Sequence, residues 1–167
     1  MSVVRLRRTF AVCVALTAAA LSAGCGFHLE GRTVLPAVMS HPYIRASDQQ
    51  SDFVQSLRRD LLIEGAHPVD AAAHASAVID VREDSVKRRV VSVSATNRPT
   101  EYEVAYTVRF SVSDGGKTLL APQTVHARRS YTFNETLVLA TQHEQSILTG
   151  AMGRELADAV MLRLARL

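Results

Sequence analysis

One stretch of the sequence alternates in side-chain character more strictly than any other, and it limits what the chain can fold into. In residues 101–112, EYEVAYTVRFSV, apolar side chains occupy every second position. They are Tyr102, Val104, Tyr106, Val108, Phe110 and Val112. Successive side chains of a β-strand point to opposite faces of the sheet. The pattern therefore predicts an antiparallel strand with one face in the core and the other in solvent.

Three further segments have strand character. Residues 77–95 alternate less strictly, which suggests a bulge, and they end at the turn TNRPT, where Pro99 cannot donate a ladder hydrogen bond. The tight-turn sequence SDGGK precedes another strand, with alternate positions Val125, Ala127, Arg129, Tyr131 and Phe133 in register. A short strand is expected around Tyr43 and Ile44.

Two segments predict helices. In residues 47–65, Phe53, Leu57 and Leu61 recur at a spacing of four, Ser51 or Asp48 can cap the start, and Gly65 can end the helix. In residues 137–167 a second apolar stripe is formed by Leu148, Met152, Leu156, Val160 and Leu164, widened by Ile147 and Ala159. Within it, Gly150 and Gly153 each cost about 1 kcal/mol relative to alanine, unless they permit close packing.

The order of these elements is strand, helix, three strands, helix. It predicts an α+β fold: a two-layer sandwich in which two helices pack on one face of an antiparallel or mixed four-stranded sheet. Because no linker-like stretch and no repeat interrupts residues 25–167, they are expected to form a single domain.

The first 24 residues have the features of a signal peptide that is removed. Three arginines precede an uncharged run from Thr9 to Gly24, which is shorter than a membrane span of about 20 apolar residues and ends in small residues. A single-pass anchor is the alternative. Ser22-Ala23-Gly24-Cys25 resembles the bacterial lipobox, so Cys25 is the expected lipidation site; a free buried cysteine is the alternative.

Two further expectations depend on this cleavage. Cys13 would leave with the signal peptide and Cys25 would be acylated, so no disulfide could form. In enterobacterial lipoproteins an aspartate after the lipidated cysteine favours the inner membrane, so Gly26 predicts a lipid-anchored protein of the outer membrane, exported across the inner one.

Charge is distributed unevenly along the chain. The signal peptide holds three of the 19 basic residues and none of the 16 acidic ones, so the remainder is formally neutral and gives no evidence for nucleic-acid binding. Between residues 87 and 129, however, only three acidic residues accompany eight basic ones: Lys87, Arg88, Arg89, Arg98, Arg109, Lys117, Arg128 and Arg129. Such a zone could meet lipid phosphates, although a solvated face explains the run KRR equally well.

The sequence contains none of the common catalytic or nucleotide-binding motifs. G-x-S-x-G, H-E-x-x-H, G-x-G-x-x-G and P-loop patterns are missing, and the six histidines show no metal-ligand spacing. Asp48 and Asp52 are better explained by helix capping than by acid–base chemistry. We therefore expect a non-enzymatic protein without a metal or cofactor other than the covalent lipid.

Four segments together resemble the LptE family of lipopolysaccharide-assembly lipoproteins. They are CGFHLEG at the cysteine, EYEVAYTVRFSV on the central strand, RRSYTF, and VLATQHEQ at the start of the last helix. The resemblance implies an α/β sandwich that plugs the outer-membrane β-barrel LptD, helps to assemble it, and assists lipopolysaccharide insertion into the outer leaflet. A free periplasm-facing lipoprotein that binds a lipid or another ligand, without a barrel partner, is the alternative.

The resemblance also suggests where lipopolysaccharide could bind. The family's basic residues lie near the turn before the EY strand and at the start of the last helix, where this chain has Ala95 and the uncharged Thr141. Arg98 can substitute for the first. Arginine can hold a phosphate through two parallel hydrogen bonds. The candidate lipopolysaccharide-binding residues are therefore Arg98, Arg88, Arg89 and Lys87.

Overall fold

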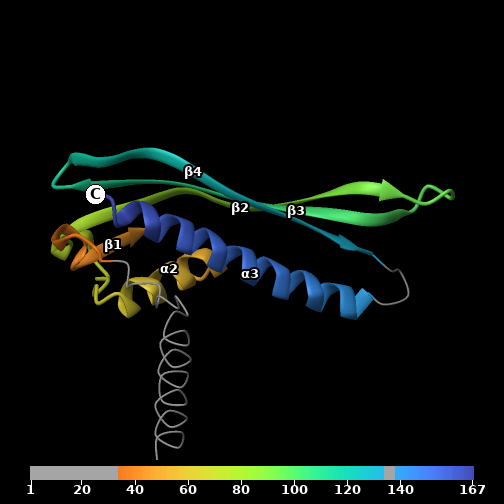
Figure 1. The fold of residues 1–167 in the computed structure, drawn as a ribbon, viewed down its shortest axis with the longest axis horizontal. Coiled ribbons are helices and arrows are strands. Elements are labelled where there is room, and N and C mark those ends of the chain that lie inside the picture. The colour runs from red at the N-terminus through yellow and green to blue at the C-terminus, as the bar shows by residue number, and fades with distance from the viewer. Residues whose placement is uncertain (1–33, 134–137) are drawn as a thin grey trace, which may run out of the picture. The chain divides into compact units, whose positions relative to one another are not determined.

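The computed structural model describes residues 34–133 and 138–167 as part of one compact unit. The predicted signal peptide and Cys25 lie outside the described residues. The described part forms a four-stranded sheet in the order β1-β2-β3-β4, with helices α2 and α3 on one face (Figure 1). The predicted α+β class, with a mixed sheet and two helices packed against it, is therefore confirmed.

One parallel and two antiparallel pairings build the sheet. The strands are β1 (Pro42–Arg45), β2 (Ala77–Val93), β3 (Pro99–Asp114) and β4 (Lys117–Thr132). Strand β1 runs parallel to the first residues of β2, and β2, β3 and β4 form an antiparallel meander. Gly115 and Gly116 have φ of 52° and 89° in the turn between β3 and β4, a conformation that glycine adopts without a steric penalty.

The alternation of β3 sets the two faces of the sheet. Val104, Val108 and Phe110 are completely buried on the helix face, as the sequence pattern predicts. The bulge expected in β2 lies between Val81 and Glu83. Because it inserts one extra residue, it changes the parity of β2 and brings Asp84 opposite Val108 on the helix face.

Helix α2 (Asp52–Ile63) begins and ends where its sequence predicts. The Ser51 side chain accepts a hydrogen bond from the Val54 N–H at 3.2 Å, which satisfies one of the free donors of the first turn. Gly65, with φ of 84°, follows the last turn. Phe53, Leu57 and Leu61 are fully buried and form the apolar stripe that packs into the core.

Helix α3 (Val138–Leu164) is longer than α2 and packs against both α2 and strands β3 and β4 (Figure 1). Four members of its predicted stripe are buried, namely Met152, Leu156, Val160 and Leu164, and Leu148 is partly buried. Ile147 does not widen this stripe, since 59% of it is exposed. It precedes Leu148 by one residue and is therefore turned about 100° away from the stripe.

Gly153 lies at the contact between α3 and the start of α2. A Cβ atom at this position would lie 2.9 Å from the Asp52 Cβ and 3.0 Å from the Asp52 carbonyl carbon. At Gly150 the nearest atom would be the Arg154 Nη1, at 3.7 Å. Of the two roles that the sequence leaves open for these glycines, close packing therefore holds for Gly153 alone.

A polar network fastens the start of α2 to the sheet. The Ser51 hydroxyl donates to the Asp84 carboxylate, and the Tyr106 hydroxyl accepts from the Phe53 N–H at 3.3 Å. Burial and the neighbouring carboxylate of Asp84 raise the pKa of Tyr106 well above its ordinary value. The phenol therefore stays neutral, and it satisfies a buried backbone donor that α2 itself cannot satisfy.

In the described part of the chain, no helix is long and apolar enough to cross a membrane.

Candidate functional site

A shallow hollow of about 410 Å³ lies on the helix-free face of the sheet and is dominated by cations. Lys87, Ala105 and Arg128 form one row across β2, β3 and β4, and Arg89 lies opposite Glu103 in the next row. The small side chain of Ala105 leaves the space between Lys87 and Arg128 open. The antiparallel register thus brings together residues that are 41 positions apart in the sequence.

One carboxylate, that of Glu103, lies among the cations of this basic hollow, which is lined by Lys87, Arg88, Arg89, Glu103, Ala105 and Arg128. The Arg89 Nε donates to the Glu103 Oε1 at 2.8 Å, and this hydrogen bond lowers the pKa of Glu103. Arg128 lowers the pKa further through its charge. Within the described residues, neither Lys87 nor Arg128 forms an ion pair. The hollow therefore carries a net positive charge, and Lys87 and Arg128 would not have to give up an ion pair to bind an anion.

Arg88 lies on the opposite face of the sheet. Its guanidinium carbon lies 4.6 Å from the centroid of the Tyr102 ring, a cation–π geometry. Its Nη1 donates to the Gln145 Oε1 of α3 at 3.2 Å and to the Tyr131 hydroxyl at 3.5 Å. All three residues of the run KRR line the basic hollow, but only Lys87 and Arg89 lie on the helix-free face of β2. The Arg88 guanidinium links the sheet to α3.

Arg98 lies in the turn that joins β2 to β3. The Ser94 N–H donates to the Arg98 carbonyl at 2.7 Å, and the Arg98 N–H donates to the Ser94 hydroxyl at 3.2 Å. This turn is the far end of the hairpin, beyond the row of Arg89 and Glu103. Arg98 is thus displaced from the hollow along the ribbon. Thr141 lies in the first turn of α3, and its side chain is outside what the structure describes.

Arg128 lines the basic hollow, but it is not among the lipopolysaccharide-binding residues proposed from the sequence. In a regular hairpin, the position of Arg128 opposite Ala105 could be found by counting residues from the tight turn SDGGK, because the turn sets which residues of β3 and β4 are paired. Counting back from that turn is unreliable here, since two irregularities shift the register between Phe110 and Ser113. The pairing of Ala105 with Arg128 therefore emerges only from the three-dimensional structure.

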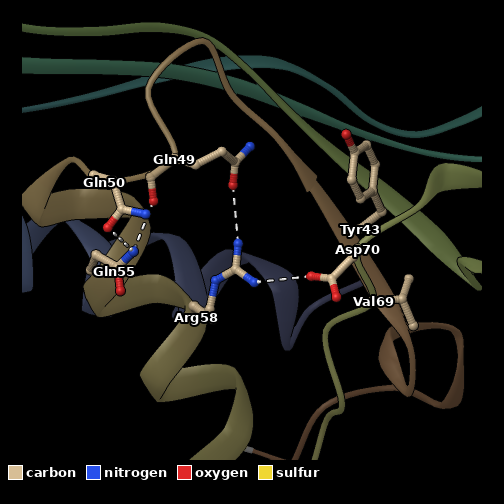
Figure 2. Close-up of a pocket in the computed structure, with 7 residues that line it drawn as sticks. All are labelled: Tyr43, Gln49, Gln50, Gln55, Arg58, Val69 and Asp70. Atoms are coloured by element: carbon tan, nitrogen blue, oxygen red, sulfur yellow. Dashed lines mark hydrogen bonds and ion pairs between the residues drawn. The ribbon is translucent and has the colours of Figure 1, made fainter.

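A second, polar pocket of about 570 Å³ lies between β1, the start of α2 and the segment that follows it (Figure 2). Arg58 is its central residue: Nη2 donates to the Gln49 Oε1 at 3.0 Å, and Nη1 lies 3.8 Å from the Asp70 Oδ1. The Gln49 amide in turn donates to the carbonyls of Ile44 and Ala46. These contacts hold α2 against the edge of β1. The polar side chains that line the pocket therefore have a structural role.

Among the residues that the structure describes, no three histidine, cysteine or acidic side chains lie close enough together to hold a metal ion.

Comparison with known proteins identifies the family of this chain. The family model LptE, described as lipopolysaccharide-assembly, matches residues 40–164. The chain belongs to the LptE family. This match includes both helices and the whole sheet, and it confirms the resemblance seen in the sequence motifs. The LptE family consists of non-enzymatic assembly lipoproteins, which also confirms the expectation that the protein is not an enzyme.

Individual proteins similar to this chain agree with it in sequence or in fold. The LPS-assembly lipoprotein LptE of Pectobacterium atrosepticum is 28% identical over 145 residues, which cover 86% of this chain and 78% of the relative. The crystal structure of the rare lipoprotein B from Shewanella oneidensis matches with a TM-score of 0.64 and 28% identity, covering 75% of this chain and 94% of that one. The solution structure of lipoprotein B from Nitrosomonas europaea has the same fold, with a TM-score of 0.69 at 24% identity and coverage of 84% and 90%.

Proposed function

We propose that this LptE-family chain is an outer-membrane lipoprotein that plugs and helps to assemble the LptD β-barrel and assists lipopolysaccharide insertion into the outer leaflet. The family match over residues 40–164 is the observation that carries the proposal. In this view the mature protein comprises residues 25–167, and the lipid on Cys25 tethers it to the membrane.

The helix-free face of the sheet is consistent with a protein that sits in a polar lumen. A plug needs an outer surface whose side chains match water and polar partners rather than lipid. On this face β2 and β3 present Ser85, Lys87, Arg89, Glu103 and Thr107. A free carrier of lipids would instead need an apolar pocket, and both hollows described above are lined mainly by polar or charged side chains.

Co-purification tests the barrel partnership. The full chain, expressed with an affinity tag in its own host and extracted in mild detergent, is expected to carry a large β-barrel partner in stoichiometric amount. Mass spectrometry of the retained protein identifies that partner. Recovery of the tagged chain alone, under conditions in which other outer-membrane complexes stay intact, would favour the free periplasm-facing lipoprotein.

Lipidation of Cys25 gives a separate prediction. The mature N-terminus is expected to be an acylated Cys25, because several acyl chains on one residue hold a protein on a membrane almost permanently. Cys25→Ala should release the domain from membrane fractions when the barrel partner is depleted. Intact-mass measurement checks the modification, and an unmodified Cys25 or a different first residue would contradict it.

We propose that the basic hollow binds the phosphate groups of lipopolysaccharide. Reversing the two cations without an ion pair, in Lys87→Glu/Arg128→Glu, leaves the Arg89–Glu103 pair in place. Since a cation near an anionic membrane surface contributes about 1 kcal/mol, we expect binding at least tenfold weaker at low salt. Titration of the purified chain with lipopolysaccharide at low and high salt measures this effect, because salt screens exposed charges beyond about 10 Å at 0.1 M.

The control for this titration is Lys117→Glu/Arg166→Glu. Both residues are exposed and neither contributes to the hollow, so the net charge changes equally while the site is intact. Equal loss in the two double variants would mean that net charge, rather than the hollow, governs binding. Unchanged affinity in Lys87→Glu/Arg128→Glu would remove the hollow from the site.

A further inference from the structure

Strand β2 has a long open edge. On one side it pairs with β3 along its length, and on the other side β1 pairs only with Ala77–Asp80. From Val81 to Val93, no described residue pairs with this second side. Figure 1 shows that β2 and β3 continue past β1 and α2 toward the hairpin turn. An edge of this kind presents unpaired N–H and C=O groups that can pair with another strand.

The charges along this open edge are arranged about one central residue. Residues 83–89 read EDSVKRR, so two acidic residues precede Val86 and three basic residues follow it. The pairing with β3 is regular over this segment, and its side chains therefore alternate between the two faces. On the helix-free face the order is Glu83, Ser85, Lys87 and Arg89, and on the helix face it is Asp84, Val86 and Arg88. Each face thus begins with an acidic residue and ends with a basic one.

A strand with this order of charges is complementary to a second copy of itself that runs in the opposite direction. If two copies pair with Val86 opposite Val86, then Glu83 lies opposite Arg89 and Asp84 lies opposite Arg88. Two-fold symmetry makes each of these pairings occur twice. Because directly opposite residues of an antiparallel pair share a face, opposite charges at these positions stabilise the pair.

The neighbouring antiparallel registers match the charges less well. With Lys87 at the centre, lysine would lie opposite lysine, and like charges at directly opposite positions are destabilising. With Ser85 at the centre, Asp84 would lie opposite Val86. Of these three registers, only the one centred on Val86 gives both acidic residues a basic partner.

The strongest charge contact of this register lies on the helix-free face. Arg89 is 70% exposed, and only its Nε is used by Glu103, so the other guanidinium N–H groups can reach Glu83 of the second copy. Glu83 itself lies opposite Arg109 of β3. Across the two copies the row would therefore read Arg109, Glu83, Arg89, Glu103, with alternating sign. Lys87 would lie diagonal to both Glu83 and Lys87 of the second copy, so its attraction and repulsion oppose each other.

The helix face contributes an apolar contact at the centre. Val86 is 43% exposed and would pack against Val86 of the second copy, which removes apolar surface of both from water. Arg88 points toward Gln145 of α3, and Asp84 accepts a hydrogen bond from the Ser51 hydroxyl. These two charges therefore keep their partners within one copy and add only general complementarity.

Strand β1 limits the length of this ladder. Asp80, the last residue that pairs with β1, would lie opposite Ser92 of the second copy. Register shifts lie between Val90 and Val93, and such irregularities bend a strand, so the second copy can leave the ladder before it reaches β1. The paired segment is then Glu83–Arg89 of each copy. A ladder of this length predicts a weak dimer that depends on concentration.

We propose that the chain forms a symmetric dimer in which Glu83–Arg89 of β2 pairs antiparallel with the same segment of a second copy, with Val86 on the two-fold axis. The two sheets join into one, with the helices of both copies on the same face. Pairing also covers an edge that would otherwise accept other strands. The dimer is a state of the chain on its own and goes beyond the proposed function, so its absence would leave the barrel partnership untouched.

Cysteine cross-linking of the full chain in mild detergent tests the register. Directly opposite residues have Cα atoms about 4.5–5.5 Å apart, which a disulfide can span. Val86→Cys is therefore expected to give a covalent dimer under oxidising conditions. The matched control is Val90→Cys, on the same face and similarly exposed, where the two cysteines would lie about 26 Å apart. No dimer for Val86→Cys, or equal cross-linking of Val90→Cys or of the wild-type chain, would overturn the proposal.

A charge swap followed by analytical ultracentrifugation tests the complementarity. Glu83→Lys places lysine opposite Arg89, and Arg89→Glu places glutamate opposite Glu83, so each variant alone should dimerise about tenfold more weakly than the wild-type chain. Mixing the two variants restores an opposite charge at both contacts, and heterodimers should form with close to the wild-type affinity. This recovery also shows that both variants are folded. A wild-type chain that stays monomeric at every concentration, or a mixture no stronger than its components, would mean that the charges protect the edge from pairing.

Discussion

Replacing Val108 with aspartate is expected to unfold the domain. Val108 is completely buried in the middle of β3, on the face that packs against the helices. A carboxylate there would lose its hydration without gaining a partner, at a cost of roughly 4 kcal/mol or more. Single domains have only about 5–15 kcal/mol of stability. Thermal unfolding followed by circular dichroism should therefore show a melting temperature lowered by tens of degrees or no cooperative transition.

The adjacent residue provides a matched control for this prediction. Thr107 lies on the helix-free face of the same strand, opposite Ser85 and His126, and is partly exposed. Thr107→Asp introduces the same charge into the same strand, but water can still reach it, so we expect a loss of about 1 kcal/mol or less. Similar losses in the two variants would mean that the assignment of faces in β3 is wrong.

Gly153→Ala is expected to destabilise the protein even though alanine is the better helix former. The new Cβ would lie 2.9 Å from the Asp52 Cβ and 3.1 Å from the Phe53 backbone nitrogen, so the start of α2 would have to move. Overpacking of this kind costs about 1–3 kcal/mol. The move would also strain the hydrogen bonds at Ser51 and Phe53, which makes the upper part of this range the expected result.

Gly150→Ala should have the opposite sign. A Cβ at this position meets only the Arg154 Nη1 at 3.7 Å and the Asp52 Oδ1 at 3.9 Å, both ordinary contacts. The gain in helix propensity, up to about 1 kcal/mol, should then appear as increased stability. Chemical denaturation of the two variants measures both effects. A stabilised Gly153→Ala variant would show that α3 and α2 do not pack as closely as described.

Local patterns were sufficient for most of the fold. The alternation in β3 and the spacing of four in α2 are visible in the sequence because the periodicity of side chains is a property of the local backbone. The cap at Ser51 and the turn at Gly115 and Gly116 are likewise local, since each depends on a few neighbouring residues. These features, together with the element order, determine the two-layer α+β sandwich.

The composition of the candidate site depended on contacts between distant segments. The sequence places four cations, Lys87, Arg88, Arg89 and Arg98, near one hairpin. The bulge after Val81 decides which of them face the helices. The pairing of the strands then adds Arg128 and the negative charge of Glu103. Arg98 remains displaced at the turn. No local pattern reports a bulge position or the register of a third strand.

The sequence by itself determined the elements of this protein, their order, and the membership of the LptE family that its motifs indicate. Tertiary structure alone decided that Gly153 is a close contact, that Ile147 is exposed, and that Arg88 lies on the other face of β2 from Lys87 and Arg89. The physical reason is that propensity and periodicity act over a few residues. Close approach, burial and charge clustering depend instead on which surfaces meet after the chain has folded.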